Sequence, residues 1–172
     1  MLNWVDIETT GLDAKKDAIL EVAIVVTDDD LNELASKSIV VMPNVSHSML
    51  MSLMDDYVRE MHMRSGLIEV LHRGPGPEQA EQALIKFLAE NSEKSPMCGS
   101  SVHFDRAFLK EQMPELEKCF AYRNIDVSTL KELVKRWSPS LEFKIDDKPH
   151  RALPDIRASI AELRHYRKEW LR

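Results

Sequence analysis

Two acidic side chains stand two positions apart near the start of the chain, in the segment Asp6-Ile7-Glu8. The residues before them are mostly apolar, which predicts a buried strand, and residues two apart on a strand point to the same face. Adjacent carboxylates repel each other and resist burial, so a divalent metal ion bound between them would relieve both costs. The alternative is that the strand has ended and that both acids are solvated.

Two further acids stand where helices are expected to begin. Asp105 falls in the first turn of a helix that follows a short strand, a place where the helix dipole favours an acid of any function. In the motif HRALPD at 150–155, Pro154 suits the first position of a helix and disfavours the helical conformation for Leu153. We therefore expect a helix that starts at Pro154, with Asp155 in its first turn and His150 on the preceding polar loop.

His150 is the candidate general base. A loop histidine beside metal-binding acids can accept a proton from water near neutral pH, whereas an exposed histidine without a catalytic role is the alternative. Together, the four acids and this histidine are far more specific than any one of them. Four carboxylates suit two Mg²⁺ ions about 3.5–4 Å apart, an arrangement that hydrolyses phosphodiester bonds.

The segment Thr9-Thr10-Gly11-Leu12-Asp13 follows the first pair of acids directly. Gly11 can adopt a positive φ there and bring the backbone close to a ligand. Leu12 has two interpretations: it plugs the core, as most apolar side chains do, or it forms a wedge that meets a substrate base.

The charge balance limits the kind of polyanion that the chain can bind. The 172 residues include 23 Lys and Arg against 29 Asp and Glu, which gives a formal net charge of -6. Such a chain lacks the basic field that drives binding along extended nucleic acid. Any nucleic acid that it binds should therefore be short or held through metal ions.

The elements that must position these residues follow from the apolar pattern. Strands are expected near 2–7, 19–26, 38–42, 96–99 and 122–127, and helices near 50–61, 80–88, 104–112, 128–137 and 154–170. This order predicts an α/β fold, a mixed β-sheet flanked by helices, with functional sites at strand ends. The length is that of one domain, residues 1–172.

The two cysteines and the start of the chain bear on location. Cys98 and Cys119 have no metal-binding spacing, and one potential bridge is a weak case for a secreted scaffold, so we expect both to be reduced. No run of about 18 apolar residues predicts a membrane span, and no signal peptide opens the sequence. We expect a cytoplasmic protein without membrane contact; a mitochondrial protein whose transit peptide is missing is the alternative.

In this order, Asp6-x-Glu8, Asp105 and His150-x4-Asp155 resemble the DEDD exonucleases of the histidine-bearing subgroup. Longer segments over nearly the whole chain resemble the oligoribonuclease family within that subgroup: WVDIETTGLD at 4–13, MDD at 54–56, SGL at 65–67, SVH at 101–103, MPEL at 113–116, YR at 122–123, DVSTLKEL at 126–133 and HRAL at 150–153. The resemblance implies a ribonuclease H-like fold, a single exonuclease domain and a homodimer. It also implies RNA degradation by 3′-to-5′ hydrolysis of RNAs of about 2–5 nucleotides, notably dinucleotides, to 5′-mononucleotides.

The resemblance also assigns roles to matching positions. Two divalent ions, Mg²⁺ or Mn²⁺, would be bound by Asp6, Glu8, Asp105 and Asp155, with His150 as the general base. The positions that would contact substrate are Leu12 as a wedge between two bases, Tyr57 stacked on a base, His62 at an active-site position, Ser101, Arg123 and Ser128 at the 5′ phosphate, and Tyr122 from across the dimer interface. A bound 5′ phosphate would explain the length limit, because a longer RNA would clash with these contacts.

Three positions depart from the family pattern: Ser100 replaces an asparagine, Tyr57 a tryptophan, and Pro154 an acid. Tyrosine can still stack on a base and proline is favoured at a helix start, so we expect activity to be retained. Two other hypotheses stay open. One is a 3′-to-5′ exonuclease acting on longer RNA or single-stranded DNA, and the other is a non-catalytic nucleotide-binding module, which Pro154 and the acidic surface would favour.

Overall fold

Five strands form one mixed sheet in the order β3-β2-β1-β4-β5. The computed structural model describes residues 1–144 and 150–171. The strands are β1 (Leu2–Thr9), β2 (Ile19–Thr27), β3 (Glu33–Val40), β4 (Pro96–Gly99) and β5 (Ala121–Asp126). The first three pair antiparallel, whereas β4 is parallel to both β1 and β5. The expected mixed sheet is therefore confirmed.

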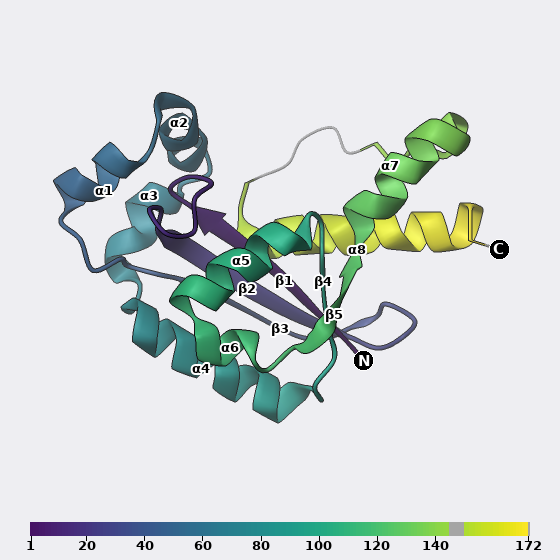
Figure 1. The fold of residues 1–172 in the computed structure, drawn as a ribbon, viewed down its shortest axis with the longest axis horizontal. Helices are drawn as coiled ribbons and strands as arrows, with labels where there is room; N and C mark the ends of the chain where they lie inside the picture. Colours follow the sequence, from purple (N-terminus) through teal and green to yellow (C-terminus); the bar gives the residue numbers. More distant parts are fainter. Residues whose placement is uncertain (145–149, 172) are drawn as a thin grey trace.

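Helices cover both faces of this sheet and extend beyond one end of it (Figure 1). They are α1 (His47–Leu53), α2 (Asp56–Arg64), α3 (Leu67–Val70), α4 (Pro77–Asn91), α5 (Val102–Gln112), α6 (Pro114–Glu117), α7 (Val127–Trp137) and α8 (Ala152–Glu169), with short 3-10 turns at Leu71–Arg73 and Pro139–Leu141. Apolar residues of α4, α5 and α6 form a core on one face, and those of α7 and α8 form a core on the other. A third cluster joins α1 and α3 to the start of β2.

Alternation along β1 decides which face receives the first acids. Val5 and Ile7 belong to the core under α4 and α5, whereas Trp4 belongs to the core under α8. Residues two apart share a face, so Asp6 and Glu8 lie on the Trp4 side, toward α8. Because Asp155 is in the first turn of α8, the sheet and this helix bring the acids together.

Three elements differ from the sequence expectation. The third strand runs over 33–40 and not 38–42, because Glu33, Ser36 and Lys37 interrupt the apolar residues at its start and leave no apolar run. The helix expected over 50–61 is two helices, since Asp55 accepts a hydrogen bond from the backbone of Val58 and starts a new helix. The last helix begins at Ala152 and not at Pro154.

The start of α8 tolerates a proline in its third position for a simple reason. The first backbone N–H groups of a helix have no partner within it, so the missing N–H of Pro154 breaks no helical hydrogen bond. The first such bond joins Asp155 N to Arg151 O at 3.1 Å. Leu153 is therefore helical, contrary to the expectation. The rest of the polar loop expected before His150, residues 145–149, lies outside the described residues.

Within residues 1–144 and 150–171, no helix is long and apolar enough to cross a membrane. Both cysteines are free thiols, with Cys98 buried in the sheet. Burial raises the pKa of the Cys98 thiol to about 12, so it stays protonated.

Candidate active site

Three carboxylates meet where β1 ends against the start of α8. Asp6, Glu8 and Asp155 each offer an oxygen, and these oxygens lie within 4.8 Å of one another. We call this group the acid cluster. Carboxylate oxygens are the ligands that Mg²⁺ and Mn²⁺ prefer, so the cluster has the donors of a hard divalent metal site.

Glu8 shows the electrostatic cost of this arrangement. Burial, together with the neighbouring charges of Asp155 and Glu21, raises its pKa from 4.5 to about 8. A cation bound beside Glu8 would stabilise its ionised form, which burial and the neighbouring acids disfavour. The carboxylates therefore fit a divalent metal ion in charge as well as in chemistry.

Asp105, the fourth expected ligand, is buried beside the cluster and is not a member of it. Its Oδ1 accepts a hydrogen bond from Ile7 N at 3.0 Å, between the two acids of β1. That N–H is available because β4 pairs with β1 only at Asn3 and Trp4. Burial raises the pKa of Asp105 to about 8. The helix-start carboxylate thus reaches the site from the α5 side.

Two histidines flank the acids from different elements. His150 is exposed, directly precedes the N-cap residue of α8, and has a φ of 48°. His62 of α2 is buried, and its Nε2 donates to the carbonyl of Thr9 at 2.8 Å. Its Nδ1 lies 3.9 Å from Glu8 Oε2, and desolvation lowers its pKa, which favours the neutral ring. His62 therefore joins α2 to the end of β1.

Leu12 is 85% exposed, so the core-plug interpretation is wrong. The loop that presents it is held by Asp17, whose carboxylate accepts from Thr10 Oγ1 and from Asp13 N. Gly11 lacks the expected positive φ. A Cβ at Gly11 would lie 2.5 Å from Asp17 Oδ2, so a larger residue there would displace the Asp17 carboxylate that holds the loop.

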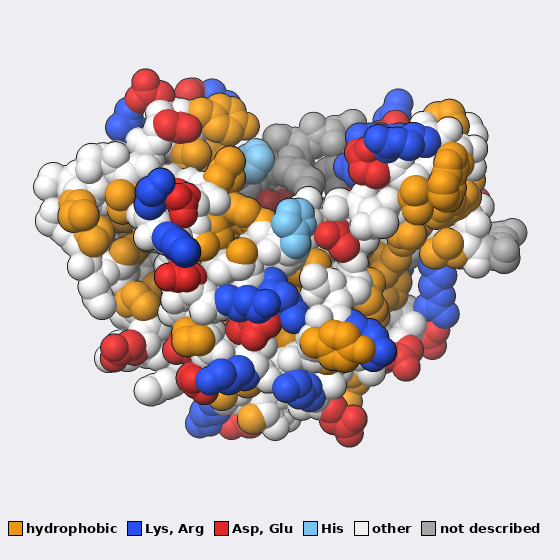
Figure 2. Space-filling view, in the orientation of Figure 1, with side chains coloured by type: hydrophobic (Ala, Val, Ile, Leu, Met, Phe, Trp, Pro, Cys, Tyr) orange, Lys and Arg blue, Asp and Glu red, His pale blue; other side chains and the backbone are white. Residues whose placement is uncertain are grey.

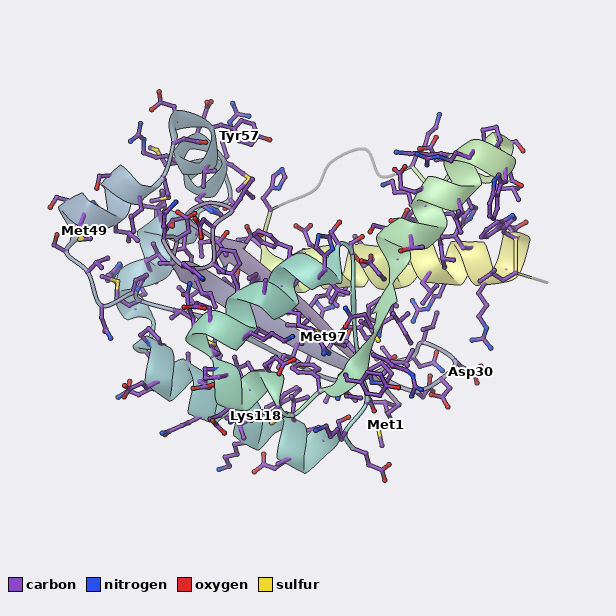
Figure 3. All side chains as sticks on the ribbon, viewed as in Figure 1. Met1, Asp30, Met49, Tyr57, Met97 and Lys118 are labelled. Carbon is purple, nitrogen blue, oxygen red and sulfur yellow. The ribbon has the colours of Figure 1, made fainter. Side chains whose placement is uncertain are left out.

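Tyr57 presents an exposed aromatic ring. Tyr57 of α2 is 72% exposed and extends from the projecting α1–α2 region (Figure 3). Figure 2 shows histidine side chains on this face, in the part that lies between the α1–α2 region and α7. An exposed aromatic ring and an exposed leucine are side chains that can contact the bases of a short nucleic acid.

Ser101 and Ser128 come together at the starts of α5 and α7, with their Oγ atoms 3.4 Å apart. Asp126 organises them: its Oδ1 accepts from Ser101 N at 2.9 Å, from Ser128 N at 3.0 Å and from Ser128 Oγ at 2.6 Å. Arg123 lies on the neighbouring strand β5, its guanidinium 4.6 Å from the centre of the Tyr122 ring. Tyr122 is 77% exposed.

Sequence reasoning missed three polar residues of this region. Asp126 was visible only as part of a matching segment, although an aspartate before a helical run is a typical N-cap. Glu21, which is buried, and Arg151, which is partly exposed, form an ion pair beside the acid cluster. The signal for Glu21 was its position as the one acid within the apolar run 19–26.

The sheet order and the flanking helices define a protein of the ribonuclease H-like fold, with the acid cluster at the end of its first strand. Exonuclease I of Methylocaldum szegediense has this fold, with a TM-score of 0.74 at 17% identity over 99% of this chain. An E. coli exonuclease I in complex with single-stranded DNA gives 0.75 at 12% identity over 99% of this chain. The chain spans 41% and 40% of the length of those two proteins.

Sequence comparison narrows this class to one family. Residues 3–163 match the RNase_T family model, described as Exonuclease. The oligoribonuclease of Bordetella pertussis is 46% identical over 99% of this chain and 96% of its own length. Those of Halorhodospira halophila and Neisseria meningitidis are 47% and 43% identical over 99% of this chain, and over 94% and 92% of their own lengths. The chain belongs to the oligoribonuclease family of exonucleases.

Proposed function

We propose that the chain, as one domain over residues 1–172, is a metal-dependent 3′-to-5′ exoribonuclease that converts RNAs of 2–5 nucleotides, above all dinucleotides, to 5′-mononucleotides. The observation behind this proposal is the acid cluster at the end of β1, in a chain whose relatives at 43–47% identity are named oligoribonuclease. A non-catalytic module would have no reason to maintain three mutually repelling carboxylates.

The acids are the proposed metal ligands. Asp6, Glu8 and Asp155 from the cluster, with Asp105 beside them, would hold two divalent ions, Mg²⁺ or Mn²⁺. When bound, such ions stabilise the charge on the attacking and leaving oxygens of a phosphodiester. The contribution of the chain is to bring three carboxylates from β1 and α8 within 4.8 Å of one another, with the carboxylate of Asp105 from α5 buried beside them.

His150 is the proposed general base. Its exposed ring accepts a proton from the water whose oxygen attacks the last phosphorus of the RNA. The bond from that phosphorus to the 3′ oxygen of the preceding nucleotide breaks, and this oxygen takes up a proton from solvent to become the new 3′ hydroxyl. The released nucleotide retains a 5′ phosphate. Support comes from the position of His150, five residues before Asp155 and directly before the helix that presents this acid.

The exposed apolar groups are the proposed base contacts. Leu12 separates the two bases of a dinucleotide, and Tyr57 stacks on one of them, as the exposure of both side chains allows. Base stacking on an aromatic ring is tolerant of sequence. His62 supports both, because it ties α2 to the backbone just before the Leu12 loop.

Ser101, Arg123 and Ser128 form the proposed 5′-phosphate site. Hydroxyl donors and an arginine suit a terminal phosphate, and occupancy by that phosphate would exclude longer RNAs. The proposal includes a homodimer in which Tyr122 completes the site of the partner subunit, since this exposed ring stands beside Arg123. It also includes a cytoplasmic location, where free thiols persist.

A substrate-length series tests the proposal. 5′-Phosphorylated RNAs of two to twenty nucleotides are incubated with Mn²⁺, and initial rates are compared. The dinucleotide should be cleaved fastest, with a steep fall beyond five nucleotides. Equal turnover of the dinucleotide and the twenty-mer would instead favour an exonuclease of longer strands, the class suggested by the fold shared with exonuclease I.

A further inference from the structure

Glu8 of the acid cluster lies directly opposite Glu21 on the neighbouring antiparallel strand. Side chains in this relation share a face of the sheet, and like charges placed there repel. Glu21 is only 2% exposed, so water does little to screen it. A second buried glutamate beside the metal ligands is costly and requires a counter-charge.

Arg151 provides this counter-charge through a two-pronged contact. Its Nε donates to Glu21 Oε2 at 2.8 Å and its Nη2 donates to Oε1 at 2.9 Å. Glu21 also accepts from Ser38 Oγ at 2.7 Å and from Ala152 N at 3.2 Å. Burial acts to raise the pKa of Glu21, but these hydrogen bonds outweigh it and the pKa is lowered. The carboxylate therefore stays ionised at neutral pH.

This Glu21–Arg151 clamp joins the sheet to the start of α8. Arg151 is the N-cap residue of that helix, His150 precedes it directly, and Asp155 follows in the first turn. The φ of 48° at His150 is uncommon for a residue other than glycine, so surrounding contacts must hold the backbone there. A bidentate contact fixes direction as well as distance.

We infer that Glu21 and Arg151 are positioning residues which hold His150 and Asp155 in register with the acids of β1. The inference rests on the proposed function, because it concerns the groups assigned to that reaction. Neither side chain is assigned a contact with substrate. Arg151 also offsets part of the repulsion on Glu8, whose pKa it lowers against the larger effects of burial and nearby acids.

The chain offers a matched control on the same helix. Arg157 of α8 forms the same two-pronged contact with Glu33 of β3, at 3.0 and 2.9 Å. This pair also ties α8 to the sheet, but it is more exposed, and Glu33 pairs with Thr27, six residues along β2 from Glu21. Glu33→Gln therefore removes an ion pair of equal geometry without touching the start of α8.

Two variants of the clamp separate positioning from folding. Arg151→Lys keeps the positive charge beside Glu21 but loses the two parallel hydrogen bonds of the guanidinium group. The double variant Glu21→Met with Arg151→Met removes both charges, so no unpaired charge stays buried and stability is largely recovered. Each is compared with wild type and Glu33→Gln in thermal unfolding, in Mn²⁺ affinity by calorimetry, and in kcat and KM on a 5′-phosphorylated diribonucleotide.

Both clamp variants should unfold near the wild-type temperature, bind Mn²⁺ more weakly and lose about tenfold or more in kcat, the usual range for a group that orients metal ligands. KM should change much less, and Glu33→Gln should match wild type in all three measurements. Wild-type kcat and Mn²⁺ affinity in a folded clamp variant, or an equal loss in Glu33→Gln, would overturn the inference. Failure of wild type to cleave would refute the proposed function instead, and Mn²⁺ affinity would still test the clamp.

Discussion

The hydrogen bonds of Asp126 give a sharp prediction for Asp126→Ala. One carboxylate oxygen caps α7 through Ser128 N and also holds Ser101 N at the start of α5. Ser101 has a φ of 57°, a conformation that its own side chain does not stabilise by a cap bond. The substitution thus releases two helix starts at once.

The expected loss is the sum of two separate contributions. Removal of an aspartate N-cap costs about 1 kcal/mol. The bond from Ser101 N to a charged, half-buried acceptor contributes about 1.5–3 kcal/mol. The free energy of unfolding should fall by about 2.5–4 kcal/mol, which corresponds to a decrease of about 5–15 °C in Tm for a domain of this size.

Asp55→Ala is the matched control, because Asp55 caps α2 through the single backbone contact with Val58 N at 2.8 Å. Its loss should stay at about 1 kcal/mol. Urea unfolding measures both variants, and KM on a 5′-phosphorylated diribonucleotide should rise about tenfold for Asp126→Ala, equivalent to one lost charged hydrogen bond. The reasoning is refuted if the two alanine variants are equally stable, since the contact with Ser101 would then contribute nothing.

Three further predictions concern the acids and the substrate contacts. His150→Ala should lower kcat by about 10²–10⁴-fold without changing Tm, and a wild-type kcat in this variant would exclude His150 as the base. Because the pKa of Glu8 is raised to about 8, the metal-free folded state retains a proton that the unfolded state releases. Its stability should therefore fall as pH rises from about 5 to 8, with a shallower slope in Glu8→Gln during thermal unfolding in chelator; parallel slopes would contradict this. Leu12→Ala should raise KM for a diribonucleotide without changing Tm, whereas Leu34→Ala, at another exposed leucine, should leave both unchanged; equal KM values in the two variants would refute the wedge.

The sequence predicted the interior of the sheet well because buried strands have a strong apolar signal. The sequence did not predict the elements whose bounds depend on polar residues. The first five residues of β3 include Glu33, Ser36 and Lys37, which leave no apolar run to detect. The break between α1 and α2 depends on one capping contact of Asp55, which an apolar periodicity does not register.

The acids of the site were predicted from their types and order, but their relative placement was not. Asp6 and Glu8 share a face by strand geometry alone, whereas the distance of Asp105 depends on where β4 stops pairing with β1. Glu21 and Arg151 are 130 residues apart in the chain, and no local pattern indicates that they meet. Contacts of this kind are decided by tertiary packing.

Cleavage of a 5′-phosphorylated diribonucleotide by wild type and Glu8→Gln tests the central claim most directly. Glutamine keeps the shape of the side chain and removes the charge that a metal ion requires. Wild type should release mononucleotides with Mg²⁺ or Mn²⁺ and stop when chelator is added, and Glu8→Gln should be inactive with either ion. Full activity in Glu8→Gln, or wild-type cleavage in chelator, would contradict catalysis by metals held at the acid cluster.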